Sequence, residues 1–204
     1  MTSRLSTGVP TLDRHLEGGV PAGALVAFTM PPATQGELVL SRLLAERHTL
    51  YLTTSRPERE IHDMIATRGG DVTATRIAPR DLVEQPDVYL DDVPDGGNVV
   101  IDTVDELERG GHDAYLDFLN RLKQQLETAN AVGLVRCLTG SEATNRRLTL
   151  DRADIVWELH VDVEKGNVET WLVVPKFRAG RALTEPVKLE LTDDVRVDTS
   201  RDIA

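Results

Sequence analysis

The sequence predicts an α/β fold in which a mostly parallel central sheet is flanked by helices and extended by antiparallel strands at its C-terminal end. Short apolar runs alternate with segments of helical periodicity, which is the pattern of strand–helix–strand units. In the last third of the chain this pattern changes to apolar runs separated by turns and charges. With 204 residues, 40% of them hydrophobic, we expect a single domain over residues 1–204 whose last residues, 198–204, form an exposed tail.

The candidate parallel strands are short, apolar and bounded by turn residues, as expected for strands buried on both faces. They cover residues 24–28, 49–53, 98–102, 131–138 and 153–159. The runs at 168–174 and 187–191 are predicted to add antiparallel strands to the same sheet.

Apolar residues spaced three and four apart predict helices with one face on the core. One such stripe opens the chain and ends at Gly18-Gly19, a second follows the first strand and a third precedes the fourth strand. Their members are Val9, Leu12 and Leu16; Val39, Leu40, Leu43 and Leu44; and Tyr115, Leu119, Leu122 and Leu126.

Composition narrows the class of partner. The formal net charge is −11, and lysine occurs at only four positions, which is typical of proteins that stay soluble in a salt-rich, halophilic cytoplasm. Bulk electrostatics therefore disfavours nucleic acid and anionic membranes as partners. The chain lacks an apolar stretch of about 18 residues and an apolar N-terminal signal, so we expect a cytoplasmic protein. The single cysteine, Cys137, rules out an internal disulfide.

The segment from Thr7 to Phe28, TGVPTLDRHLEGGVPAGALVAF, closely resembles the start of RecA-like ATPase domains of the KaiC and archaeal RadA kind. Those domains read TG-x-x-x-LD-x-x-L-x-GG-x-P-x-G before their first core strand, and later landmarks of the family follow here in the same order. The resemblance spans nearly the whole chain and implies a RecA-like P-loop fold. The matching residues are Thr7, Gly8, Leu12, Asp13, Leu16, Gly18, Gly19, Pro21 and Gly23.

In a P-loop, backbone N–H groups wrap the phosphates, a lysine neutralises them and a Ser/Thr hydroxyl holds magnesium. The corresponding loop here consists of Pro31, Pro32, Ala33, Thr34, Gln35, Gly36 and Glu37. One alignment with the family pattern GPPGTGKTTL puts Gly36 on the lysine and Glu37 on the hydroxyl, and the other puts Glu37 on the lysine and Leu38 on the hydroxyl. Both alignments lack the lysine and the hydroxyl, so the motif is degenerate.

Thr34 and Glu37 also match a capping box, in which each side chain binds the other residue's backbone N–H. A carboxylate at this place would repel a triphosphate, because two anions about 4 Å apart cost about 4 kcal/mol at an effective dielectric of about 20. We therefore expect no tight nucleotide binding and no ATP or magnesium cofactor. The alternative is a loop that binds nucleotide through backbone N–H groups alone. The scattered histidines show no metal-ligand spacing, so we expect no metal site.

Two further catalytic parts of the family have corresponding positions in this sequence. Asp102 ends an apolar strand and resembles the aspartate that orients magnesium, which makes it a relic candidate. Thr54 and Ser55 stand where KaiC-like enzymes carry a pair of glutamates, one of them the water-activating base. Glu58 and Glu60, slightly later, are predicted to lie in the first turn of a helix.

Two groups of cations remain. Lys176 and Arg178 resemble the K-x-R element that reaches a neighbouring subunit's γ-phosphate in ring assemblies, and they are candidates for action in trans. The alternative, a purely structural role, is an exposed basic loop whose charges balance acidic neighbours. Residues 145–147 and Arg152 follow the fourth strand, where recombinases place a DNA-binding loop, but no aromatic accompanies them. Asp193 and Asp194 are interpreted as solvated charge.

The leading hypothesis is a RecA/KaiC-like protein that has lost ATP hydrolysis and acts as a regulatory or scaffolding partner of other proteins. Related ATPases are the expected partners, in a homo- or hetero-oligomer. One alternative is an atypical ATPase active only in an oligomer, through Asp102, Lys176 and Arg178. The other is a recombinase-paralogue-like accessory in DNA repair, which requires binding of single-stranded DNA.

Overall fold

The computed structural model describes residues 3–164, 167–178 and 180–198. Their centre is a nine-stranded sheet in the order β11-β10-β9-β8-β3-β7-β6-β4-β5. Strands β3 to β8 are parallel to one another, and the last three strands, β9 to β11, extend the sheet in antiparallel pairing that begins at β8. This is the predicted α/β class with its C-terminal antiparallel extension, so the fold prediction is confirmed.

The strand bounds follow the apolar runs of the sequence closely. The parallel strands are β3 (Leu25–Met30), β4 (Thr49–Thr53), β5 (Val72–Arg76), β6 (Asn98–Asp102), β7 (Val132–Leu138) and β8 (Ile155–Glu164). The antiparallel strands are β9 (Asn167–Phe177), β10 (Val187–Leu191) and β11 (Val195–Val197), and β1 (Arg4–Leu5) pairs with β2 (Val20–Pro21) in a separate small sheet.

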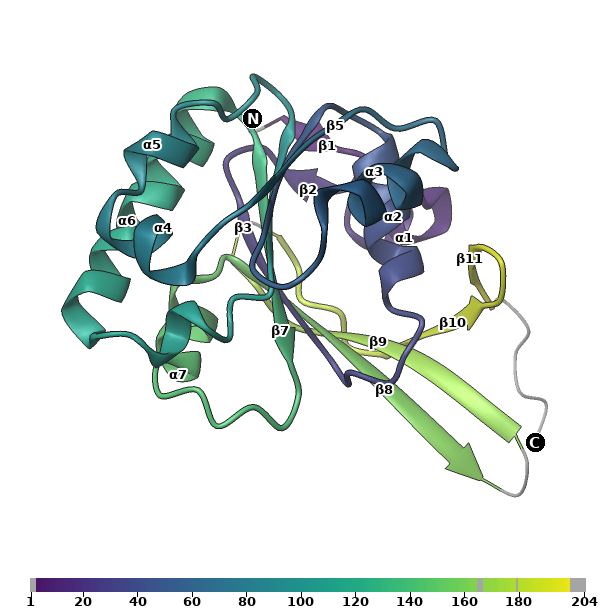
Figure 1. The fold of residues 1–204 in the computed structure, drawn as a ribbon. Helices are drawn as coiled ribbons and strands as arrows, with labels where there is room; N and C mark the ends of the chain where they lie inside the picture. Colours follow the sequence, from purple (N-terminus) through teal and green to yellow (C-terminus); the bar gives the residue numbers. More distant parts are fainter. Residues whose placement is uncertain (1–2, 165–166, 179, 199–204) are drawn as a thin grey trace.

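Helices cover both faces of the sheet (Figure 1). On one face lie α1 (Pro10–His15), α2 (Glu37–Ala45) and α3 (Glu58–Ala66). On the other lie α4 (Pro79–Glu84), α5 (Asp87–Leu90), the 3-10 helix η1 (Leu107–Arg109), α6 (His112–Ala129) and α7 (Arg146–Arg152). The predicted helical stripes fall on α1, α2 and α6, and Glu58 and Glu60 lie in the first turn of α3 as expected.

The core is divided into two layers by β3, because successive side chains of a strand point to opposite faces. Val26, Phe28 and Met30 pack toward α1 and α2, whereas Leu25 and Ala27 pack toward α6. All five side chains are buried. The chain leaves this strand at its carboxyl end and enters the loop at residues 31–36, so the loop follows a strand that is buried on both faces.

Sequence patterning missed β5 and β11. Both are edge strands, and β5 reads Val-Thr-Ala-Thr-Arg with no fully buried residue, so it carries no apolar run. The exposed tail predicted for residues 198–204 lies outside the described residues from 199 onward. Within the described residues no helix is both long and apolar enough to cross a membrane.

Strands β8 and β9 form a long hairpin that projects beyond the rest of the sheet (Figure 1). β3 pairs with β8 only as far as Thr29 opposite Glu158, and β10 pairs with β9 only as far as Leu189 opposite Thr170, so the hairpin beyond Thr170 is supported by its own two strands. Val163 and Val168 lie opposite each other there and are 68% and 64% exposed.

Candidate functional site

The loop at residues 31–36 leads from the end of β3 into α2, the place where a P-loop would hold phosphate. The helix begins at Glu37, with Gly36 as its N-cap residue. A β-carbon added to Gly36 would lie 2.8 Å from the Met30 sulfur and 3.0 Å from a Leu159 methyl group. Gly36 therefore serves close packing, and a larger side chain at this position would require its neighbours to move.

The expected capping box does not form. The Thr34 hydroxyl accepts a hydrogen bond from the N–H of Gly36 at 3.3 Å and donates one to the Pro31 carbonyl at 3.0 Å. No side chain caps α2. Glu37 turns instead to the guanidinium of Arg56, whose Nη2 donates to Glu37 Oε1. A charged donor is a stronger partner for a carboxylate than a neutral backbone N–H, so the ion pair replaces the predicted cap.

Glu37 belongs to a network of two carboxylates and two guanidinium groups, which we call the Glu37 network: Glu37, Arg56, Asp102 and Arg136. Arg136 Nη1 lies 2.7 Å from Asp102 Oδ1, and Arg136 Nη2 lies 4.0 Å from Glu37 Oε1. Arg56 Nε lies 3.9 Å from Asp102 Oδ2. Each arginine therefore lies within 4.0 Å of both acids, and the formal charges sum to zero.

Strand register explains how Asp102 meets Arg136. The two residues are direct partners on the adjacent parallel strands β6 and β7. Their side chains share the face of the sheet that α2 covers, two residues beyond Val100 and Leu134 of that layer. Arg136 is a charged residue in an otherwise apolar strand, and Asp102 neutralises it. Arg56 arrives from the turn after β4, where its N–H donates to the Thr53 hydroxyl at 2.9 Å.

The buried end of the network is closed by Tyr51. Its hydroxyl donates to Asp102 Oδ2 at 2.5 Å, so both carboxylate oxygens of Asp102 are engaged. Asp102 is fully buried. Burial, followed by the nearby Asp102 charge, raises the pKa of the Tyr51 hydroxyl well above its usual value. Tyr51 therefore remains a neutral donor at physiological pH.

Thr54, which stands in the place of a family glutamate, binds backbone. Its N–H donates to the Asp102 carbonyl at 2.8 Å, and its hydroxyl accepts from the N–H of Thr103 at 3.1 Å. The adjacent Ser55 is exposed. These contacts fix the chain after β6 but supply no carboxylate that could take a proton from water.

The residues at this edge do not fit a magnesium nucleotide. A metal ion at Asp102 would have to share that carboxylate with the Arg136 guanidinium 2.7 Å away, and the two cations would repel each other. The loop supplies no cation for the phosphates, and Glu37 adds an anion at its end. Within the described residues no group of three or more His, Cys, Asp or Glu side chains could hold a metal ion.

Arg146, the centre of the predicted DNA-contacting group, forms a second buried network with Asp105, Glu108 and Thr149. Its Nε lies 2.9 Å from both Glu108 oxygens, its Nη2 lies 2.7 Å from Asp105, and its Nη1 donates to the Leu138 carbonyl. Glu108 is fully buried and also accepts a hydrogen bond from Thr149. We call these four residues the Arg146 network.

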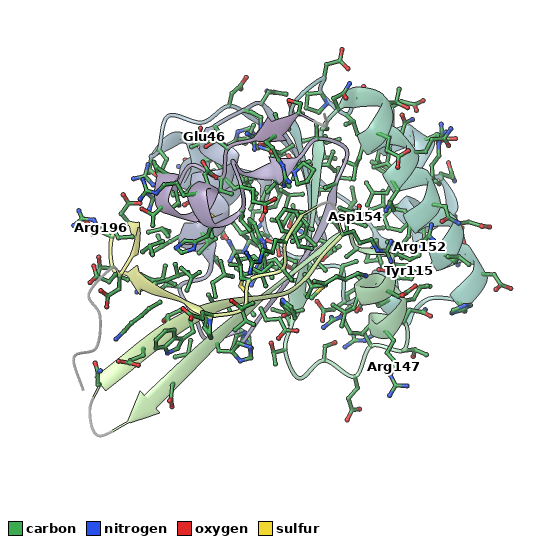
Figure 2. The ribbon with its side chains drawn as sticks, turned by 180° about the vertical axis from the view of Figure 1, so that it is seen from behind. Glu46, Tyr115, Arg147, Arg152, Asp154 and Arg196 are labelled. Carbon is green, nitrogen blue, oxygen red and sulfur yellow. The ribbon has the colours of Figure 1, made fainter. Side chains whose placement is uncertain are left out.

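Of the other residues in that group, two make contacts within the protein and one is exposed to solvent. Asn145 is buried, and its amide donates to the carbonyls of Glu108 and Gly110 at 3.0 Å each. Arg152 binds Asn120 on α6. Arg147 is exposed and points away from the body of the protein (Figure 2). The group therefore does not form a continuous basic surface.

Lys176 and Arg178 lie at the end of β9 and cap α7. Lys176 Nζ donates to the carbonyls of Leu150 and Asp151 at 2.8 and 2.7 Å, and Arg178 Nη2 donates to the Asp151 carbonyl at 2.6 Å. Cations at the carboxyl end of a helix are favoured by its dipole. Partial burial and the neighbouring Arg178 charge lower the pKa of Lys176. Both cations therefore have a structural role within their own chain.

These two cations lie at the opposite edge of the sheet from the loop. Ile155, which pairs with Phe177, also pairs with Val26 near the start of β3, whereas the loop follows the end of that strand. At about 3.3 Å per residue the two places are roughly 16 Å apart along the strand. Lys176 and Arg178 therefore cannot reach the loop of their own chain.

The turn between β10 and β11 is joined to the loop side of the molecule. Asp194, interpreted as solvated charge, pairs with Arg42 of α2 and lies 3.0 Å from Arg68 Nη1 after α3, so that interpretation is wrong. The hydrogen bond from Arg42 lowers the pKa of Asp194. The Gln35 amide, oriented to donate, lies 2.7 Å from the Leu191 carbonyl. The C-terminal strands thus hold the loop in place.

An open groove of about 460 Å³ lies beside the loop. Its lining is largely apolar, because the hairpin and the C-terminal sheet contribute aliphatic side chains. The lining residues are Pro32, Ala33, Thr34, Gln35, Val161, Val168 and Leu191. It contains no charged side chain among these residues that could receive a phosphate.

Sequence reasoning missed Tyr51, Arg56 and Arg136. Arg136 carried a usable signal, because an arginine inside the run Val-Gly-Leu-Val-Arg-Cys-Leu must find an acid on a neighbouring strand. Tyr51 and Arg56 carried none, because their roles depend on which strands are adjacent and on the turn after β4.

The same fold occurs in a KaiC-like protein from the hyperthermophilic archaeon Pyrococcus horikoshii OT3. The two structures match with a TM-score of 0.77 over 97% of this chain and 100% of that chain, at 14% sequence identity. At this identity the likeness shows the fold, and it confirms the RecA/KaiC-like architecture implied by the opening segment. None of the curated proteins compared with the chain matches it. Residues 4–204 match the family of unknown function DUF7125, and the chain belongs to that family.

Proposed function

We propose that this chain is a non-catalytic protein of the KaiC-like RecA fold that acts as a regulatory or scaffolding partner of other proteins. The Glu37 network carries the proposal. The aspartate available for magnesium is engaged by Arg136 and Tyr51, and an acid occupies the start of the helix where phosphate would bind. Catalysis of phosphoryl transfer depends on positioned cations and an aligned nucleophile. In the described site the two arginines are paired with acids, and no carboxylate is placed to activate water.

Titration of magnesium-ATP into the wild-type chain at molar salt, followed by calorimetry and a phosphate-release assay, tests the catalytic part of the proposal. We expect neither binding at micromolar nucleotide nor turnover. Micromolar binding with turnover that disappears in Asp102→Asn would overturn the proposal and favour an ATPase. Asp92→Asn, at an exposed aspartate, is the matched control.

Related RecA-fold ATPases are the proposed class of partner. Lys176 and Arg178 support this choice, because they lie at the sheet edge opposite the loop and Arg178 is exposed there. The test mixes this chain with a KaiC-like ATPase that has an intact P-loop. We expect co-elution and a change in that enzyme's hydrolysis rate, both reduced in Lys176→Gln/Arg178→Gln.

Thermal unfolding of the double variant separates this effect from the loss of the α7 cap. Arg181→Gln, on an exposed arginine nearby in the sequence, is the matched charge control. A wild-type chain that neither binds the ATPase nor changes its rate would overturn the choice of partner. A specific shift of single-stranded DNA at molar salt that Arg147→Ala abolishes would favour the DNA-repair interpretation instead.

A further inference from the structure

The Glu37 carboxylate lies next to two guanidinium groups that a phosphate group could bind in its place. We propose that Arg56 and Arg136 form a metal-free oxyanion site for phosphate, and that the Glu37 carboxylate occupies this site as an internal competitor. The proposal does not depend on the proposed function, because a chain without ATP hydrolysis can still bind a free oxyanion.

The two arginines converge on one oxygen of Glu37. Arg56 Nη2 donates a hydrogen bond to Oε1, and Arg136 Nη2 lies 4.0 Å from the same atom. Arginine forks match the oxygens of phosphate as well as those of carboxylate. The place now taken by one oxygen of Glu37 is therefore chemically suited to an oxygen of a phosphate group.

The arginines are held independently of Glu37. Asp102, fully buried, lies 2.7 Å from Arg136 and 3.9 Å from Arg56. The Arg136 side chain is 90% buried, being 10% exposed, and its Nε has no hydrogen-bond partner among the described residues. Arg136 Nη2, the atom that faces Glu37 Oε1, lies 4.0 Å from it, beyond hydrogen-bond distance, so this nitrogen can still donate to an oxygen that comes closer.

Glu37 is the most exposed member of the network. Its side chain is 36% exposed, against 25% for Arg56 and 0% for Asp102. An ion pair with one partner at the surface is weak, and rotation of the glutamate side chain would move the carboxylate into water without breaking the Asp102 contacts. Glu37 can therefore leave the network while the other three residues stay in place.

The charge balance then favours an anion. With Glu37 turned out, Arg56, Arg136 and Asp102 have a formal sum of +1, and the first turn of α2 adds the positive end of its dipole. A phosphate group supplies the missing negative charge. Arg136 pairs with Asp102, so the cation beside this carboxylate is a guanidinium group. The proposed site therefore binds phosphate without a magnesium ion.

The decisive experiment compares phosphate affinity in the wild-type chain and in Glu37→Gln, by calorimetry with inorganic phosphate at one fixed salt concentration. Removing the competing carboxylate should lower the dissociation constant by about tenfold. Glu60→Gln, which removes an exposed first-turn acid from α3, should match the wild type. The double variant Glu37→Gln/Arg56→Gln should lose the gain. Arg136 is left intact in all variants because buried Asp102 needs its charge.

Two further measurements keep the test decisive. Phosphate should raise the melting temperature of Glu37→Gln more than that of the wild type, since a ligand stabilises the state that binds it. A parallel titration with ADP and a metal chelator identifies the source of the group: a gain with ADP alone assigns the site to phosphate esters, and a gain with both ligands assigns it to the shared phosphate group. Equal affinities of wild type and Glu37→Gln for both inorganic phosphate and ADP, or a gain that survives loss of Arg56, would overturn the proposal.

Discussion

The Glu37 network and the Arg146 network both pair arginine with acids at the carboxyl edge of the sheet. They differ in how completely their members are paired and buried. Arg146 donates to Glu108, Asp105 and the Leu138 carbonyl, and both acids are at most 5% exposed. In the Glu37 network the Arg136 Nε is unpaired among the described residues, and Glu37 is partly exposed. The first cluster fixes the loops, whereas the second retains an exchangeable member.

This difference distinguishes a cluster that the fold requires from a cluster that can lose one member. A buried acid that loses its cation is strongly destabilising, so the Arg146 network must stay intact for the fold. A partly exposed acid can be removed at small cost, so the Glu37 network can change its occupant. Substitutions in the two networks should therefore differ most in their effect on the free energy of unfolding.

The largest effect is expected for Arg146→Ala. It leaves the Glu108 and Asp105 charges buried without their cation, which should lower the free energy of unfolding by about 3–5 kcal/mol. Urea denaturation at constant salt measures the change. Arg147→Ala, at the exposed neighbour, should remain within about 0.5 kcal/mol of wild type. Similar small losses for both variants would contradict the structural role of the Arg146 network.

Tyr51→Phe should have an intermediate effect, because Asp102 loses one hydrogen-bond donor but keeps Arg136. We expect a loss of about 1–3 kcal/mol. The raised pKa of Tyr51 also adds stability that is complete below the ordinary tyrosine pKa of about 10 and is lost as the pH rises toward the folded-state value. Denaturation across alkaline pH should therefore show a shallower decline for Tyr51→Phe. A parallel decline in the two proteins would be the contrary result.

Glu37→Gln should lower the free energy of unfolding by at most about 1 kcal/mol, because the pair with Arg56 is partly exposed and Asp102 remains to balance the arginines. Urea denaturation in phosphate-free buffer, with Glu60→Gln as the control, measures this change. A loss comparable to that of Arg146→Ala would erase the distinction between the two networks.

Asp194→Asn should have the smallest effect, about 0.2–1 kcal/mol near neutral pH, since Asp194 is 23% exposed and its hydrogen-bonded partner Arg42 is 36% exposed. The lowered pKa of Asp194 means that its contribution is complete above the ordinary aspartate pKa of about 4 and is lost as the pH falls through the lower folded-state value. Wild type and variant should therefore converge in acid. Acid denaturation curves with a constant separation would disagree with this assignment.

Particular residues show what the sequence could and could not predict. The apolar runs located the central strands, because burial on both faces demands continuous hydrophobicity. Edge strand β5 escaped, since its Thr-Ala-Thr core satisfies no such demand. Thr34 and Glu37 fitted a local capping pattern that a distant guanidinium overrode. Local spacing cannot show a partner that a different strand brings in.

The position of Lys176 and Arg178 relative to the loop also limits the symmetry of any assembly that uses both. A contact between the cation edge of one copy and the loop edge of another joins two different surfaces, so no two-fold axis can relate the copies. Repetition of such a contact gives a closed ring or an open filament, and each row has a direction. Every copy in the row has the α7 end of the sheet at its front and the loop at residues 31–36 at its back.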